Sequence, residues 1–133
     1  MKKLFSLFIT ITLLSVVTSC KKVEGPGGSS TIKGSIIAQI DDGFGGVLGT
    51  YAPVEEDVYI IYGSDAEDTF YDDDVKTSYD GTFEFNFLEE GTYRIFTYSK
   101  NNAVFGGKEV IIREVVIDSK KQTVEMDQIV IWK

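Results

Sequence analysis

Histidine is absent from this 133-residue chain, which removes the usual general base near neutral pH and the commonest metal ligand in proteins. Cysteine occurs once, at Cys20, so the chain cannot form an intrachain disulfide. Basic residues are scarce as well, because 13 Lys and Arg stand against 21 Asp and Glu. The net charge of −8 argues against a nucleic-acid partner, since phosphate binding requires a basic surface. Nucleophile motifs are also missing, so we predict no catalytic residues, no cofactor and no enzymatic activity.

The N-terminus has the organisation of an export signal. Two lysines precede an apolar stretch, LFSLFITITLLSVV, which has the length of a signal-peptide core and is short for a membrane span. The next residues, Val17-Thr18-Ser19-Cys20, resemble a bacterial lipobox, with Val17 where leucine is usual. The resemblance implies that residues 1–19 are removed and that Cys20 becomes a lipidated first residue. A plain secretory signal with an incidental cysteine is the alternative.

The chain that remains after this cleavage is strongly acidic. Removing residues 1–19 takes away two lysines and no acid, which leaves 11 basic and 21 acidic residues and a net charge of −10. Residues 20–30, which include the lipidated cysteine, have the composition of a flexible linker. Short charged segments after such a cysteine resemble surface-export signals of the Bacteroidetes, although here the charges are mostly lysine. We therefore predict anchoring in the cell envelope, at the outer membrane, facing either the periplasm or the cell surface.

The clearest strand pattern lies in the middle of the chain. Thr82–Leu88 alternates strictly, so that Phe83, Phe85 and Phe87 should share one buried face. The Asp80-Gly81 pair before it is a hairpin signal, because glycine accepts the positive φ of a tight turn. Three phenylalanines on one face are enough to anchor the core of a β-sandwich.

The strand that follows has two distinct faces. Along residues 92–99, Tyr93, Ile95 and Thr97 alternate with Arg94, Phe96 and Tyr98. Five further segments have strand patterns, and none has a convincing helical period. The seven predicted strands are residues 31–40, 58–63, 76–79, 82–88, 92–99, 109–118 and 123–132, with loops at 41–57, 64–74 and 101–108. The sequence therefore predicts an all-β fold, a seven-stranded antiparallel β-sandwich over residues 31–133.

Four segments resemble carboxypeptidase regulatory-like, or transthyretin-like, domains. They are Gly34-Ser35-Ile36, Val58-Tyr59-Ile60, Thr77-Ser78-Tyr79-Asp80-Gly81-Thr82-Phe83-Glu84-Phe85 and Leu88-Glu89-Glu90-Gly91-Thr92-Tyr93. The resemblance implies a Greek-key, prealbumin-like sandwich that serves as a binding, spacing or scaffold module without catalytic residues. Glu90 departs from the family, which often has proline there. We also expect Tyr93 to bury its ring while its hydroxyl bonds backbone across the corner at Gly91.

Two groups of residues are candidate sites. Residues 65–74 carry six acids in ten positions, and Asp72, Asp73 and Asp74 are candidate calcium ligands. They lack the order of an EF-hand loop, which favours a solvated acidic loop and no metal. Phe70 and Tyr71, between the acidic runs, are candidates for contact with a ligand.

Together these observations favour a non-enzymatic, membrane-anchored envelope lipoprotein that acts as a binding or assembly module. Its expected partners are the membrane, through the lipid on Cys20, and another envelope protein or a glycan. A calcium-stabilised adhesin-like or carbohydrate-binding domain is the first alternative. A small envelope hydrolase is the second, and the absence of histidine weighs against it.

Overall fold

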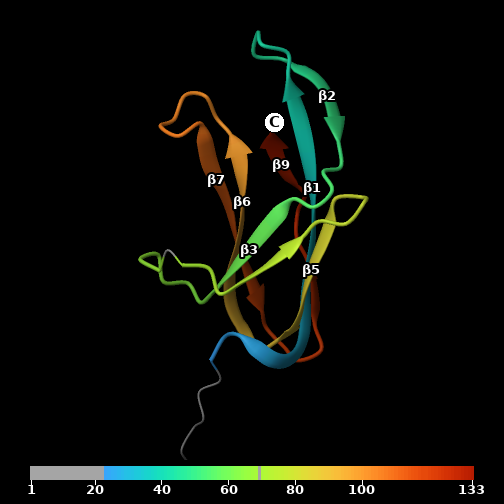
Figure 1. Cartoon of the computed structure of the whole chain (residues 1–133). Helices are drawn as coiled ribbons and strands as arrows, with labels where there is room; N and C mark the ends of the chain where they lie inside the picture. Colours follow the sequence, from blue (N-terminus) through green and yellow to red (C-terminus); the bar gives the residue numbers. More distant parts are fainter. Residues whose placement is uncertain (1–22, 69) are drawn as a thin grey trace, which may run out of the picture.

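A computed structural model describes residues 23–68 and 70–133, so the predicted signal peptide and Cys20 lie outside the described residues. The described part consists of strands and loops, and it contains no helix able to span a membrane. Two sheets pack face to face, as Figure 1 shows, and the predicted β-sandwich is confirmed. The strands are β1 (Pro26–Asp41), β2 (Val47–Tyr51), β3 (Asp57–Tyr62), β4 (Asp73–Lys76), β5 (Thr82–Leu88), β6 (Gly91–Lys100), β7 (Lys108–Ile117), β8 (Thr123–Glu125) and β9 (Ile129–Trp132).

One sheet is built around β1, which is 16 residues long. Its first part pairs antiparallel with β5 and its last part with β2, while β8 and β9 pair with it in parallel. The other sheet is antiparallel, in the order β4-β3-β6-β7. The prediction of seven purely antiparallel strands is therefore wrong. A strand as long as β1 offers room for two successive neighbours along each edge, and the predicted last strand breaks at Asp127-Gln128 into β8 and β9.

The core lies between the two sheets and is made of the inward-facing residues of both. Every second residue of the paired strands is buried, as the alternation predicts. The buried aliphatic and aromatic residues are Ile32, Ile36, Ala38, Val58, Ile60, Phe83, Phe85, Leu88, Tyr93, Ile95, Val115, Ile117, Ile129 and Ile131. No buried side-chain nitrogen or oxygen in the described residues lacks a hydrogen-bond partner, so the core contains no uncompensated polar group there.

Phe87 departs from the predicted phenylalanine face. Phe83 and Phe85 are buried, whereas 72% of Phe87 is exposed and its φ is +60°. Phe85 pairs with Ile32 and Leu88 with Ser30, so two residues of β5 stand opposite one residue of β1. This is a β-bulge, and the extra residue turns the pattern by one position. Leu88 consequently takes the inward place that the alternation predicts for Phe87.

The corner at the start of β6 has the tyrosine arrangement that the sequence predicts. The Tyr93 hydroxyl donates to the carbonyl of Glu89 (2.8 Å) and accepts from the Gly25 N–H (3.0 Å). Gly25 thus joins the corner to the segment that enters β1. Residues 26–30, predicted as flexible linker, are in fact the first part of β1, because they pair with the end of β5.

Two short strands correct the predicted loops. The loop predicted at residues 41–57 contains β2, which pairs with the last residues of β1. The strand predicted at residues 76–79 is shifted to Asp73–Lys76, because the chain turns at Ser78, whose carbonyl accepts from the Gly81 N–H (3.0 Å). Gly81 has a φ of +77°, as expected for the hairpin turn.

Candidate functional site

The outer face of the four-stranded sheet carries a cluster of aromatic rings, here called the aromatic face. It consists of Tyr59 on β3, Phe96 and Tyr98 on β6, and Tyr71 from the loop before β4. Alternation turns the neighbours of these strand residues inward, which leaves the rings on the side away from the core. Tyr59 and Phe96 are direct partners in the β3–β6 register, so their rings lie side by side.

The ring geometry is that of a packed aromatic cluster. The Tyr59 ring stacks on Phe96, with centroids 4.9 Å apart and 19° between the planes. Tyr71 lies 4.7 Å from Tyr59 at 54°, and Tyr98 lies 5.9 Å from it at 76°. Phe96 is 6% exposed, so its neighbours cover it, whereas Tyr71 is 52% and Tyr98 41% exposed. The cluster therefore has a covered centre and open rings at its edges.

The loop that carries Tyr71 is attached to the sheet by several hydrogen bonds. The carboxylate of Asp72 accepts from the Tyr62 N–H (2.7 Å), and the Asp72 N–H donates to the Ile60 carbonyl (2.9 Å). Arg94, on the same outer face, donates to the carbonyls of Asp68 (3.1 Å) and Gly63 (3.4 Å). The loop that carries Tyr71 is thus hydrogen-bonded to both β3 and β6.

Polar groups border the aromatic face at the β3–β4 side. Lys76 and Asp57 form an ion pair (2.6 Å), and Asp74 is the β4 partner of Tyr59 in the register. Burial, followed by the nearby Asp57 carboxylate and Tyr71, raises the pKa of Tyr59 above its ordinary value. The Tyr59 hydroxyl is therefore protonated throughout the neutral range and is available as a hydrogen-bond donor.

The aromatic face continues onto β7 as an aliphatic strip. Val110 is the register partner of Tyr98, and Ile112 is the partner of Phe96. Both are about half-exposed, and so is Val116 farther along the strand. Val110 and Ile112 therefore extend the exposed apolar surface from the aromatic face onto β7.

Of the two predicted ligand-contact residues, the structure brings only Tyr71 into the cluster. Phe70 is 82% exposed, and its N–H donates to the Asp68 side chain (3.2 Å). The other three members were not among the predicted site residues. The signal that could have found them is the presence of aromatic residues at the solvent-facing positions of two predicted strands, Tyr59 on one and Phe96 with Tyr98 on the other.

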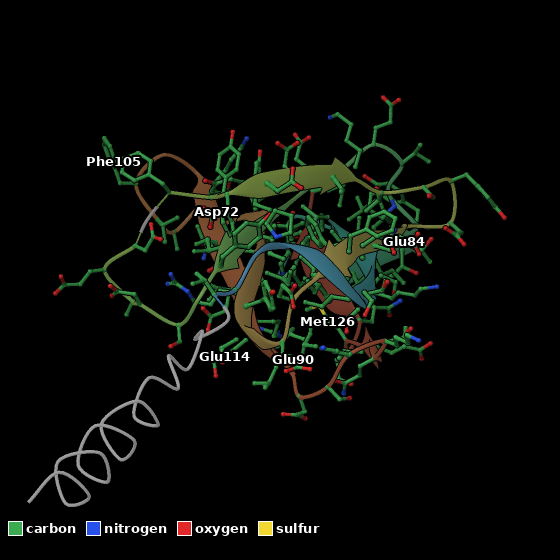
Figure 2. The ribbon with its side chains drawn as sticks, turned by 90° about the horizontal axis from the view of Figure 1, so that it is seen from below. Asp72, Glu84, Glu90, Phe105, Glu114 and Met126 are labelled. Carbon is green, nitrogen blue, oxygen red and sulfur yellow. The ribbon has the colours of Figure 1, made fainter. Side chains whose placement is uncertain are left out.

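The predicted acidic candidates do not converge. Asp72 is engaged by the Tyr62 N–H, while Asp73 and Asp74 are consecutive on β4 and so point to opposite faces of the sheet. In Figure 2 the labelled Asp72 lies well away from the labelled acids Glu84 and Glu90. Within residues 23–68 and 70–133, no three acidic or cysteine side chains are grouped so as to hold a metal ion.

A depression of about 620 Å³ lies where β1, β4 and β5 approach one another. Its lining includes the ion pair of Lys33 with Glu84 (3.3 Å) together with Glu125. The one aromatic residue in its lining, Phe83, is buried in the core. With no exposed ring in its lining, this depression offers less to the apolar face of a ligand than the aromatic face does.

Comparison with known proteins gives a fold likeness only. No family model and no curated protein matches the chain. A candidate carbohydrate-binding protein from Pseudomonas aeruginosa is similar at 14% identity and a TM-score of 0.47, over 86% of this chain and 92% of that one. A DUF3823 family protein from Parabacteroides merdae is similar at 20% identity and a TM-score of 0.36, over 75% of this chain and 46% of that one. An (S)-allantoin synthase is similar at 14% identity and a TM-score of 0.40, over 81% and 43%. At these values the likenesses do not identify a function.

Proposed function

We propose that this protein is a non-catalytic carbohydrate-binding module, and that the aromatic face binds the sugar. The observation that carries the proposal is the cluster of Tyr59, Tyr71, Phe96 and Tyr98, with open rings next to carboxylates and an ammonium group. A sugar ring has apolar C–H faces and a hydroxyl-bearing edge. An exposed aromatic ring packs against the first, and charged or hydroxyl groups hydrogen-bond to the second.

The polar border of the aromatic face fits this chemistry. Asp57 and Asp74 supply acceptors for sugar hydroxyls, and Lys76 supplies donors. The phenol groups of Tyr71 and Tyr98 add hydroxyls at the exposed rims of the cluster. Because the cluster packs on a sheet and its loop is hydrogen-bonded to that sheet, little ordering is needed when a ligand binds.

The location and family that the sequence predicts belong to the same proposal. Lipidation at Cys20 would anchor the module to the cell envelope, and a transthyretin-like Greek-key domain without catalytic residues agrees with a role in binding. In this arrangement the protein holds a glycan at the envelope and does not cleave it.

Titration of the mature protein with a panel of soluble polysaccharides in affinity gels, followed by calorimetry, tests the proposal. The double variant Tyr71→Ala with Tyr98→Ala should weaken binding at least about tenfold, equivalent to about 1.4 kcal/mol. Tyr79→Ala is the matched control, because Tyr79 is 84% exposed on the hairpin turn and makes no ring contact within the described residues. If no polysaccharide is retained, or if the double variant binds like the control, the proposal is wrong.

A second candidate function is assembly with another envelope protein, favoured by the aliphatic strip on β7. Val110 and Ile112 have no hydroxyl or amide to offer a sugar, whereas a protein partner would bury them. Val110→Ser with Ile112→Ser should then abolish capture of a protein partner while leaving polysaccharide binding unchanged. A loss of polysaccharide binding in that variant would assign the strip to the sugar site.

A further inference from the structure

The aromatic face does not end at Tyr98. Tyr98 also lines a depression of about 230 Å³ that it shares with Lys100, Lys108 and Trp132. Trp132 and Lys100 in turn line a second depression, of about 300 Å³, with Asp41, Asn101, Asn102, Ala103 and Glu109. The two depressions adjoin because they have Lys100 and Trp132 in common. A connected surface thus leads from Tyr71 and Tyr59, past Tyr98, over the end of the sandwich to Trp132.

Trp132 is fixed at this end by its backbone. Its N–H donates to the buried Ser99 hydroxyl (2.9 Å), and the Lys133 N–H donates to the Gln39 carbonyl (3.0 Å). The Lys133 ammonium pairs with Glu56 (2.6 Å) at the start of β3. The last residues of the chain therefore cross from one sheet to the other and hold the indole at the rim. The indole N–H makes no hydrogen bond within the described residues, which leaves it available to a ligand.

The wall opposite Trp132 is formed by the loop between β6 and β7, which is held by hydrogen bonds of Asn101. The Asn101 N–H donates to the Gly107 carbonyl (3.0 Å) and closes the loop. The Asn101 side chain donates to Glu109 (3.0 Å) and accepts from the Ala103 N–H (2.9 Å). Figure 1 shows this loop beside the C-terminus, at the end of the sandwich away from the N-terminal segment. In Figure 2 Phe105, at its tip, projects away from the packed centre.

We infer that the aromatic face and the Trp132 rim form one elongated track, and that the ligand is a linear oligosaccharide of several units. This inference rests on the proposed function. Along the track the rings of Tyr71, Tyr59 and Tyr98 come first, with centroid steps of 4.7 and 5.9 Å. The polar side chains of Lys100 and Asn102 and the Trp132 ring follow. Each depression at the rim is at or below the lower end of the size of a small-molecule pocket, about 300–1,000 Å³, and each is open. An extended chain can lie on the aromatic face and continue into the two small open depressions that adjoin it, whereas a compact ligand would use only one of them.

Trp132 is the only tryptophan in the chain, so its fluorescence reports on the rim separately from the tyrosines. The experiment uses the mature full-length protein and oligomers of two to six units cut from the polysaccharide that binds in the affinity gel. Affinity should rise at least about tenfold from the shortest to the longest oligomer. Tryptophan emission should change only with the longer oligomers, because the shorter ones occupy the aromatic face alone.

Two variants complete the test. Trp132→Ala should remove the gain with length while leaving the affinity for the shortest oligomer unchanged. Asn102→Ala, at an exposed position with no side-chain hydrogen bond in the described residues, should reduce the gain even if Trp132→Ala fails to fold. Binding that is independent of length, or emission that is unchanged at saturation with the longest oligomer, would overturn the elongated track while leaving binding at the aromatic face intact. If no polysaccharide binds at all, the proposed function fails and the inference fails with it.

Discussion

Replacement of Phe85 by alanine gives the sharpest test of how the two sheets are held together. Phe85 is 3% exposed, pairs across the sheet with Ile32 and meets the Phe83 ring edge-on at 6.1 Å. A buried phenylalanine removes about 150–250 Å² of mostly apolar surface from water, at about 25 cal/mol per Å². Because the emptied space closes only in part, Phe85→Ala should cost about 3–5 kcal/mol.

Phe87 supplies the matched control, since it is the same residue type on the same strand two positions away. It is largely exposed at the bulge, so Phe87→Ala should change stability by less than about 0.5 kcal/mol. Phe87→Gly should stabilise the protein by up to about 1 kcal/mol, because glycine accepts the φ of +60° without the strain that a side chain imposes.

Urea denaturation of the three variants measures these differences, and thermal unfolding checks them. At roughly 4 °C per kcal/mol for a domain of about 100 residues, Phe85→Ala should lower Tm by about 12–20 °C. A typical domain has only about 5–15 kcal/mol of stability, so this variant should be visibly destabilised at room temperature. Equal costs for Phe85→Ala and Phe87→Ala would refute the bulge and restore the simple alternation that the sequence suggests.

Three further outcomes are expected. Mass spectrometry of the mature protein should show an acyl-modified Cys20 at the N-terminus, and Cys20→Ala should release the protein from the membrane fraction; an unchanged membrane fraction would argue against lipidation. Calcium should produce little or no change in Tm, and a large rise that Asp72→Asn with Asp73→Asn abolishes would establish a metal site. Burial raises the pKa of Tyr62 and of Tyr93 above the ordinary value of 10.0, so the native state retains protons that the unfolded chain releases. Stability should therefore be complete below about pH 10 and fall as the pH rises through the raised values, and urea midpoints that stay constant from pH 8 to pH 11 would contradict this.

The order and faces of most strands followed from the sequence because short-range alternation decides them. Tyr93 and Ile95 point inward and Arg94 outward, as the predicted period-two pattern of residues 92–99 requires. The bulge at Phe87 could not be predicted in this way, since it depends on how the end of β5 meets the start of β1. The same is true of the segment that begins at Gly25. Its glycine- and serine-rich composition is typical of a linker, yet it pairs with β5 and bonds to Tyr93.

The candidate site was less accessible to sequence reasoning, because its members come from different strands. Tyr71 could be singled out by its position between acidic runs. Its contact with Tyr59 depends on a loop held by Asp72 and Arg94, and no local pattern shows that. Trp132 is a still clearer case, since it lines a depression with residues about thirty positions earlier in the chain. Such proximity depends on how the strands are arranged in the sheets and not on the spacing of the residues along the sequence.

The central place of β1 has a mechanical consequence. The chain passes from residue 23 through Gly25 into β1, which is hydrogen-bonded along both of its edges. A pull on the proposed tether would run along β1 and load its bonds with β5 and β8 together, in shear, because the antiparallel bonds with β5 lie perpendicular to the strand and the parallel bonds with β8 cross to it at a slant. The two bonds of the Tyr93 hydroxyl strengthen the point at which the load enters. A domain loaded in this way should resist drag on a bound polymer more firmly than one whose tether peels an edge strand away bond by bond.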